Sequence, residues 1–233
     1  MREVETLRYK AIVIGQPRNR DGESHAEVQS MNCFPEPSRT FACYAPTKSR
    51  LRVIRDGHSI IRSASVPKPI VLVDTREQDP FPLLANHPNR IGAEKRIGLK
   101  TGDYGIEGME GLLALERKSL ADIVSCTVTC RQRFIAVCSR LAQFRWKAIL
   151  IEATLEDVKQ GFDQFDIPSE VHPNAVCGFL DAIEAKFSIP VIYTSRIKAL
   201  ATERAASWLS KHFTYWWLEQ NGHGRVLIDA DGL

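Results

Sequence analysis

At 233 residues, the chain is long enough for one good-sized domain and an appendage. Its hydrophobic content of 44% and charged content of 25% allow a packed core without disulfides or structural metals. The net charge of +3 is modest, and no apolar run approaches the roughly 18 residues of a membrane span, which excludes a transmembrane helix.

The first 66 residues lack sustained hydrophobic periodicity and predict an irregular or partly ordered basic arm. Within it, residues 39–62 hold six Lys or Arg against the single acid Asp56. This excess fits a nucleic-acid partner and fits a solvated charged surface equally well. Two short apolar pieces fit strands, AIVI at 11–14 and LRVI at 51–54. The linker-like SVPKP then separates the arm (1–66) from a domain at 67–233.

From residue 70 onward, short apolar runs alternate with longer amphipathic ones, and eleven Lys or Arg against six acids fall within residues 90–147. The predicted strands are 70–74, 95–99, a glycine-rich hairpin at 101–108, 112–118, 148–153 and 189–194. The predicted helices are one that starts at Leu120 after the N-cap Ser119, then 131–144, 173–187 and 196–213. Together they predict an α/β fold with helices on a mixed central sheet.

Acidic residues and one lysine gather at the ends of the predicted strands. Glu116 and Lys118 share one face of their strand because strand side chains alternate, while Arg117 points to the other face. Asp103 in the hairpin and Asp74 at the end of the first strand can reach the same cleft. Three carboxylates are therefore expected to converge beside one lysine.

Clustered carboxylates repel one another unless a cation lies between them, so we expect a hard, oxygen-preferring ion such as Mg²⁺, with Mn²⁺ able to substitute. Such an ion polarises a phosphoryl oxygen and orients a water, while Lys118 stabilises negative charge or helps to deprotonate the water. The combination predicts phosphodiester hydrolysis. A lone Glu-x-Lys is more often a surface pair, and Asp122 either supports the metal site or is simply a helix-terminal acid.

Three motifs follow one another along this part of the chain: VDTRE at 73–77, TGDY at 101–104 and ERKSLAD at 116–122. In this order and spacing they resemble the nuclease motifs of the XPF-type endonuclease family. The resemblance covers residues from about 70 to 213 and is greatest with small stand-alone bacterial or phage members. It continues through three further motifs, CRQRF (130–134), AILIE (148–152) and HPNAVCGFL (172–180).

The resemblance implies a restriction-endonuclease-like core that cuts DNA at junctions between double and single strands with a divalent metal. Carried over position by position, it implies that the catalytic and metal-binding residues are Asp74, Asp103, Glu116 and Lys118. The backbone carbonyl of Arg117 would be a further metal ligand. The residues that would support the site are Arg76, Glu77 and Asp122.

The DNA-binding residues that the resemblance implies are Arg117, Arg131 and Arg133. The last two begin a predicted helix, where guanidinium groups can make bidentate phosphate contacts, although helix-surface arginines would look the same in sequence. Cys130 stands where the family usually has glycine, which can change the bend of the loop. The tandem helix-hairpin-helix modules of eukaryotic relatives do not fit here, so we expect substrate choice to rest on the nuclease domain, the basic arm or a partner.

Other functions fit the same residues. The chain could be a catalytically silent DNA-binding partner subunit, a nuclease that acts on RNA or plain duplex, or an α/β domain whose acids are surface charges. Dimerisation through the last two helices is expected by family analogy, although the apolar residues 213–217 fit a core equally well.

The cysteines and the N-terminus indicate a cellular compartment. The six cysteines form no CxxC pair or regular framework, and there is no signal-peptide h-region, so we expect a reduced, cytoplasmic protein. The resemblance favours a bacterial or phage origin. Cys126 and Cys130 could share a helix face, where buried small side chains are favoured over a metal site.

Overall fold

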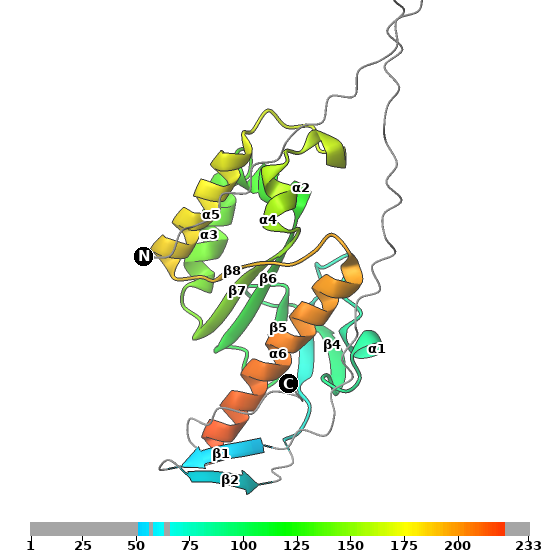
Figure 1. Ribbon diagram of the computed structural model, residues 1–233, viewed down its shortest axis with the longest axis vertical. Coiled ribbons are helices and arrows are strands. Elements are labelled where there is room, and N and C mark those ends of the chain that lie inside the picture. Colours follow the sequence, from blue (N-terminus) through cyan, green and yellow to red (C-terminus); the bar gives the residue numbers. More distant parts are fainter. Residues whose placement is uncertain (1–50, 56–57, 63–65, 222–233) are drawn as a thin grey trace, which may run out of the picture. The chain divides into compact units, whose positions relative to one another are not determined.

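The computed structural model describes residues 51–55, 58–62 and 66–221 (Figure 1). In the first two ranges, β1 (Leu51–Arg55) pairs antiparallel with β2 (His58–Arg62). The second of the two strands predicted in the arm is therefore confirmed. The first lies outside the described residues, and the domain boundary after residue 66 stays a prediction.

A six-stranded mixed sheet, in the order β4-β3-β5-β6-β7-β8, forms the centre of the described part from residue 66 onward. Its strands are β3 (Ile70–Asp74), β4 (Ala93–Ile97), β5 (Tyr104–Ile106), β6 (Leu113–Ser119), β7 (Trp146–Glu152) and β8 (Val191–Tyr193). The β5 strand is antiparallel to both of its neighbours, whereas the β3–β4, β6–β7 and β7–β8 pairs are parallel. The predicted mixed central sheet is confirmed.

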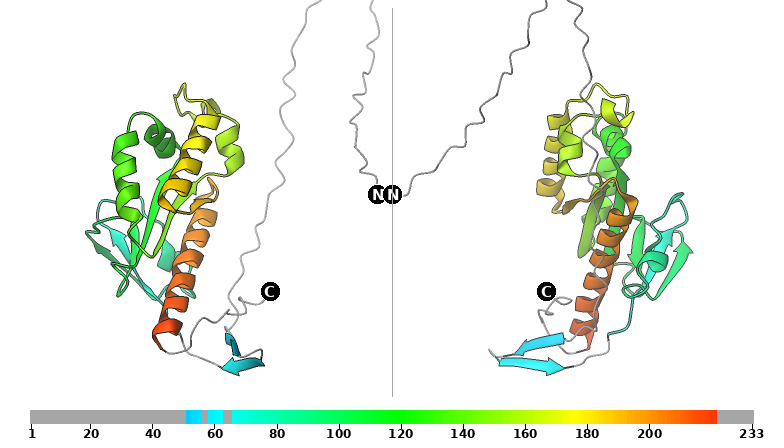
Figure 2. Two further views of the ribbon diagram at one scale, coloured as in Figure 1. Left: turned by 90° about the vertical axis from the view of Figure 1, so that its left-hand side faces the viewer. Right: turned by 45° about the vertical axis from the view of Figure 1, so that its right-hand side comes forward.

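Helices cover both faces of this sheet (Figures 1 and 2), so the predicted α/β class is confirmed. The helices are α1 (Leu83–Asn86), α2 (Leu120–Thr127), α3 (Arg131–Leu141), α4 (Leu155–Lys159), α5 (Pro173–Phe187) and α6 (Lys198–Gln220), with a 3₁₀ turn at Asp163–Phe165. The α2 to α5 helices pack on one face, and α1 and α6 pack on the other. The sheet is therefore the middle of three layers.

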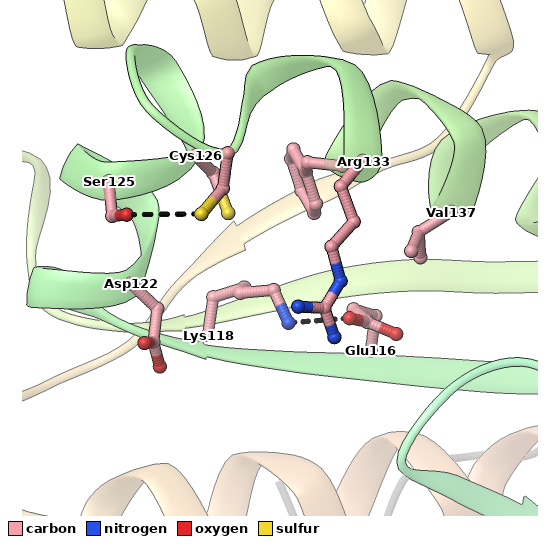
Figure 3. A pocket seen from close by; sticks show the side chains of 9 residues that line it. Glu116, Lys118, Asp122, Ser125, Cys126, Arg133 and Val137 are labelled. Carbon is pink, nitrogen blue, oxygen red and sulfur yellow. Dashed lines mark hydrogen bonds and ion pairs between the residues drawn. The ribbon is translucent and has the colours of Figure 1, made fainter.

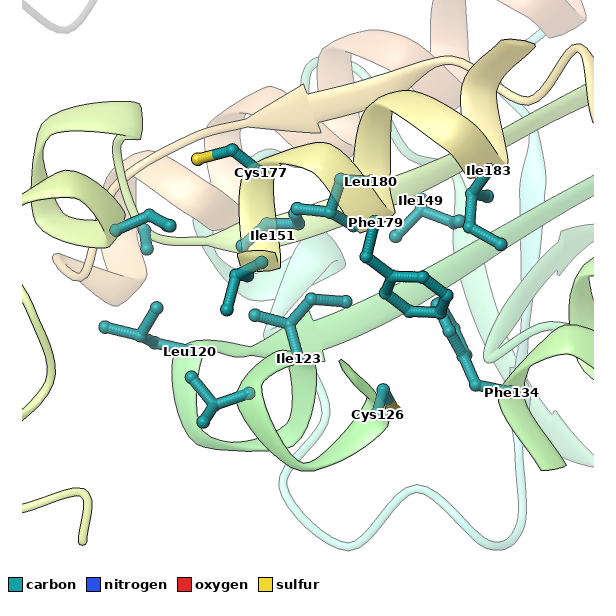
Figure 4. Close-up of a cluster of buried hydrophobic side chains, with 14 of the residues drawn as sticks. Leu120, Ile123, Cys126, Phe134, Ile149, Ile151, Cys177, Phe179, Leu180 and Ile183 are labelled. Atoms are coloured by element: carbon teal, nitrogen blue, oxygen red, sulfur yellow. The ribbon is translucent and has the colours of Figure 1, made fainter. Parts of the chain in front are cut away.

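Two apolar clusters fill the space between these layers, and β7 contributes to both. Ile149 and Ile151 enter the cluster under α2, α3 and α5 (Figure 4), while Ala148 and Leu150 enter the cluster under α6. A strand covered on both faces needs an almost continuous apolar sequence, which explains AILI. The edge strand β4 has the opposite character, because its AEKRI sequence leaves charged side chains exposed and discourages pairing with another chain.

The last helix is longer than the sequence pattern predicts, since α6 ends at Gln220 and not at residue 213. Phe213 and Leu218 are buried, and Trp216 and Trp217 pack partly buried beside them. The aromatic segment thus belongs in large part to the core of its own chain. Dimerisation through the last two helices stays a prediction.

Within the ranges that the structure describes, none of the helices has the length and apolarity needed to cross a bilayer.

Candidate active site

Asp103, directly before β5, connects β3 with β6 through its backbone and its carboxylate. Its N–H donates to the carbonyl of Leu115 at 2.9 Å, and its own carbonyl accepts from the N–H of Asp74 at 2.9 Å. Its Oδ2 accepts from the N–H of Arg117 at 2.7 Å. The preceding Gly102 has φ of 81°, and a Cβ there would lie 3.2 Å from the Leu115 carbonyl oxygen, so only glycine allows this approach without strain.

Glu116 and Lys118 lie on the face of β6 that α2 and α3 cover. The Glu116 side chain is almost fully buried, and the Lys118 Nζ lies 2.5 Å from its Oε1. The same Nζ donates to the carbonyl of Arg117 at 3.2 Å and lies 5.8 Å from the ring centre of Phe134. Burial lowers the pKa of Lys118, but attraction from Glu116 and Asp103 outweighs it and raises the pKa overall. Lys118 is therefore an ammonium ion at neutral pH.

The carboxylates of Asp103 and Glu116 share this single ammonium. Burial, followed by repulsion from Glu116, raises the pKa of Asp103 from its usual 3.8 to about 7, although Lys118 and the Arg117 N–H act in the opposite direction. Two neighbouring carboxylates, one buried and one partly buried, repel each other when both are ionised. This is the electrostatic condition that favours a further cation or a protonated acid.

Asp74, the third acid predicted for the site, is paired with Arg76. Its buried carboxylate accepts from the backbone N–H of Arg76 at 2.9 Å and from its Nε at 3.1 Å, and the guanidinium forms an ion pair with it. The Arg76 guanidinium also donates to the carbonyl of Leu99 at 2.7 Å. The Arg76 side chain holds the pKa of Asp74 below its usual value. Asp74 is thus ionised, and Arg76 of the same VDTRE motif neutralises its charge.

The predicted metal can be tested against these oxygen atoms. Among the described residues, no group of three or more His, Cys, Asp and Glu side chains is arranged to hold a metal ion. The donors present are carboxylates and a backbone carbonyl, the ligands that Mg²⁺ prefers. Glu116 and the Arg117 carbonyl already face one cation, the ammonium of Lys118. The donor set therefore fits a hard divalent ion in its chemistry, with Asp103 beside it and Asp74 turned toward Arg76.

A cavity of about 270 Å³ opens over Glu116 and Lys118, between β6 and the helices α2 and α3 (Figure 3). Arg133 from α3 points into it. Its lining residues are Glu116, Lys118, Asp122, Ser125, Cys126, Cys130, Arg133, Phe134 and Val137. A buried acid and two cations thus share a cavity with polar and apolar walls.

Asp122 has a part in the helix cap as well as in the cavity wall. The hydroxyl of Ser119, the residue that caps α2, donates to the Asp122 carboxylate at 2.8 Å and accepts from its N–H at 3.1 Å. The carboxylate also stands in the first turn of α2, where the helix dipole favours an acid. The interpretation of Asp122 as a helix-terminal acid is therefore observed, and its support of a metal site stays a prediction.

Arg131 and Arg133, both predicted to contact DNA, have different surroundings. Arg131 donates to the carbonyl of Thr127 at 3.2 Å, and its guanidinium lies 4.3 Å from the ring centre of Phe179. It therefore satisfies a carbonyl at the end of α2 and packs on α5. Arg133 lines the cavity, which makes it the better placed of the two to meet a phosphate.

The guanidinium of Arg117 lies on the opposite face of β6 from the cavity. It donates to Glu152 at 2.5 Å, to Glu77 at 3.0 Å and to the carbonyl of Asp79 at 2.7 Å, and it lies 4.6 Å from the ring centre of Phe81. Its side chain is only 12% exposed. This placement is at odds with the predicted DNA contact, because the charge faces the layer behind the sheet.

Sequence reasoning gave no role to Glu152, although it stands in the AILIE motif. The strand pairing explains how Glu152 reaches the site. Arg117 aligns with Leu150 in the parallel β6–β7 pair. Side chains alternate along a strand, so Glu152, two residues after Leu150, lies on the same face as the Arg117 side chain. Register between distant strands cannot be read from one sequence. Glu77, predicted to support the site, pairs with this same arginine, and its supporting role stays a prediction.

The cysteines of the described ranges are all free, namely Cys126, Cys130, Cys138 and Cys177. Cys126 is buried, in agreement with the small-core-residue interpretation, whereas Cys130 is exposed and accepts a hydrogen bond from the hydroxyl of Ser125 at 3.5 Å. The burial expected for Cys130 is therefore wrong, because the residue lies in the turn before α3.

No family model matches the chain, and no curated protein matches it. Among solved structures, it is similar to XPF from Aeropyrum pernix, with 18% identity over 62% of this chain and 61% of that chain and a TM-score of 0.48. It is also similar to XPF from Aeropyrum pernix in complex with DNA, with 18% identity, 66% of each chain covered and a TM-score of 0.46. The chain thus spans under two thirds of the length of these structures.

Proposed function

We propose that the chain is a divalent-metal-dependent DNA endonuclease that hydrolyses phosphodiester bonds. The observation that carries the proposal is the group formed by Asp103, Glu116 and Lys118, in which two carboxylates share one ammonium beside a cavity that also holds Arg133. Two sequence motifs supply these acids and the lysine, TGDY and ERKSLAD, and together with VDTRE they add support for an XPF-type nuclease.

Each residue has a definite part in this chemistry. Asp103, Glu116 and the carbonyl of Arg117 would hold the ion, with Asp74 available once its carboxylate leaves Arg76. When bound, a Mg²⁺ ion supplies Lewis-acid activation of a phosphoryl oxygen and of a water. Lys118, charged at neutral pH, stabilises negative charge on the phosphate and is not a base in this state. Arg133 binds a neighbouring phosphate from the rim.

The substrate class follows from the resemblance and not from the acids. An oxygen-lined metal site does not distinguish ribose from deoxyribose. Branched or flapped DNA with junctions between double and single strands is the substrate that the motifs imply, and the basic cluster at 39–62 is the expected source of additional phosphate contacts.

The first test is cleavage of labelled flap, fork, single-strand and plain duplex DNA, and of matched RNA, with Mg²⁺, with Mn²⁺ and with chelator. Lys118→Ala should abolish cutting. Lys147→Ala is the matched control, because Lys147 stands on the neighbouring strand, donates to the carbonyl of Ala142 and does not line the cavity. Equal cutting by Lys118→Ala and wild type would show that the assigned site is wrong.

A second candidate function is supported by one observation. Glu116 and Asp74 are both neutralised within the chain, by Lys118 and Arg76 respectively, as they could be in a DNA-binding partner subunit without catalysis. Tight binding of forks by the wild type, with no cutting of any substrate in Mg²⁺ or Mn²⁺, would establish this function in place of the nuclease.

A further inference from the structure

The peptide groups of Arg117 lie at the centre of the candidate site. The N–H of Arg117 donates to the Asp103 carboxylate at 2.7 Å. The carbonyl of Arg117 accepts from the Lys118 ammonium at 3.2 Å. One residue of β6 thus orients an acid with its N–H and faces the site's cation with its carbonyl, so a small rotation of the strand here would disturb both.

The Arg117 side chain is fixed behind the sheet by two carboxylates from different elements. Glu152 stands at the end of β7, and Glu77 stands in the loop after β3. The side chains of Arg117 and Glu152 are each 12% exposed, and that of Glu77 is 14% exposed. Burial lowers the pKa of the Arg117 guanidinium, but Glu152, followed by Tyr104 and Glu77, outweighs this effect and raises the pKa overall. The Arg117 guanidinium is therefore charged, and two largely buried carboxylates hold it in a fixed direction. We call the group formed by Arg117, Glu77 and Glu152 the cage.

The cage is connected to the long helix on that face. Asp79 accepts from the Arg117 guanidinium through its carbonyl at 2.7 Å, and its carboxylate forms an ion pair with Lys198 in the first turn of α6. Two segments, β7 and the loop after β3, therefore converge on one guanidinium, and α6 is linked to it through Asp79. Such an arrangement resists rotation of the Arg117 backbone better than a single ion pair.

We propose that Glu152, acting with Glu77 through the Arg117 guanidinium, is a positioning residue that fixes the Arg117 peptide groups against Asp103 and against the cation of the site. The inference rests on the proposed function. Glu152 touches neither Lys118 nor the cavity lining, so any effect on chemistry must pass through Arg117. Partners of this kind typically change metal affinity or activity by about 10-fold to 100-fold when removed.

The test compares Glu152→Gln with Glu219→Gln. Glu219 pairs with Arg145 between α6 and the start of β7, so its variant also removes an Arg–Glu ion pair but lies outside the cage. Mn²⁺ binding to the DNA-free protein is measured by electron paramagnetic resonance, and kcat and KM are measured on flap DNA, below the melting temperature of every variant. Glu152→Gln should weaken Mn²⁺ binding and lower kcat by about tenfold or more, with KM for DNA unchanged, while Glu219→Gln should do neither.

A second variant guards against simple loss of folding. In Arg117→Met/Glu152→Leu/Glu77→Gln the buried charges are replaced by uncharged side chains and Glu77 is not left as an unpaired carboxylate, an exchange that is often neutral for stability. A triple variant that melts like the wild type yet binds Mn²⁺ and cuts about tenfold more weakly supports positioning. If it melts, binds and cuts like the wild type, the inference is overturned.

The outcomes separate this inference from the function on which it rests. If the wild type neither binds Mn²⁺ nor cuts DNA, the proposed function fails and the inference fails with it. If the wild type binds and cuts, Lys118→Ala does not cut, and Glu152→Gln matches Glu219→Gln in Mn²⁺ affinity and kcat, then the nuclease stands and the positioning role of Glu152 is refuted.

Discussion

Replacing Asp103 with asparagine should change how the stability of the metal-free protein depends on pH. In the folded chain, burial and then Glu116 raise the pKa of Asp103 from 3.8 to about 7. A group whose folded pKa is raised contributes stability that is complete below its unfolded pKa and is lost as pH rises through its folded pKa. The wild type should therefore lose stability relative to Asp103→Asn between about pH 4 and pH 7.

The size of the effect follows from that pKa. A difference of about three pKa units, at about 1.36 kcal/mol each, corresponds to roughly 4 kcal/mol. In a domain of this size, 1 kcal/mol changes the melting temperature by about 2–4 °C. The melting temperature of Asp103→Asn minus that of the wild type should thus be roughly 8–16 °C larger at pH 8 than at pH 4.

The assay is thermal unfolding in chelator, followed by circular dichroism from pH 4 to pH 8. Burial lowers the pKa of His87 and His212 below 6.5. Their contribution to stability is therefore present above about pH 6.5 and lost as pH falls. Both histidines remain in the variant, so the difference between the two proteins removes their contribution. A difference that is constant across this pH range would refute the electrostatic account of the site.

The other expectations concern single steps of the same account. Glu116→Ala should abolish cutting with DNA binding retained, and cutting at the wild-type rate would show that the site is wrongly assigned. Arg133→Ala should weaken DNA binding and its salt dependence, whereas Arg131→Ala should lower the free energy of unfolding by about 1 kcal/mol; equal losses of DNA affinity would contradict this division. Gly102→Ala should cost about 1–2 kcal/mol by urea unfolding because its φ is positive, and an unchanged midpoint would exclude that strain. Deleting residues 1–66 should weaken DNA binding and flatten its salt dependence; unchanged affinity over a salt series would assign the arm another role.

The elements that sequence predicts well are those with strong local signals. The strand at Ile70–Asp74 and the helix at Pro173–Phe187 have the predicted bounds. The first is a continuous apolar run, and the second begins with a proline at its first position. The edge strand Ala93–Ile97 was expected two residues later, because its register is fixed by pairing with β3 and not by its own charged sequence. The short helices α1 and α4 were not predicted, since each is too short to show periodicity.

The candidate site shows the same division between local and long-range information. Strand alternation alone places Glu116 and Lys118 on one face and Arg117 on the other, because the period of a strand is two residues. The pairing of Asp74 with Arg76 and the cage formed by Glu77 and Glu152 depend on rotamers and on contacts between segments far apart in sequence. Residue types at the right spacing therefore identify the acids, and only the fold tells which of them are already neutralised.

The two faces of β6 carry different charged groups, and their burial shows that these acids are not simply surface charges. On one face, Glu116 is buried and Asp103 is partly buried beside it, and desolvation followed by repulsion from Glu116 raises the pKa of Asp103 to about 7. On the other face, the guanidinium of Arg117 is surrounded by more carboxylate than it can neutralise. A chain that needed only stability would pair these charges more evenly or replace them with apolar side chains. The proposed cation site therefore rests on the repulsion between Asp103 and Glu116, and the pH dependence of Asp103→Asn tests that repulsion directly.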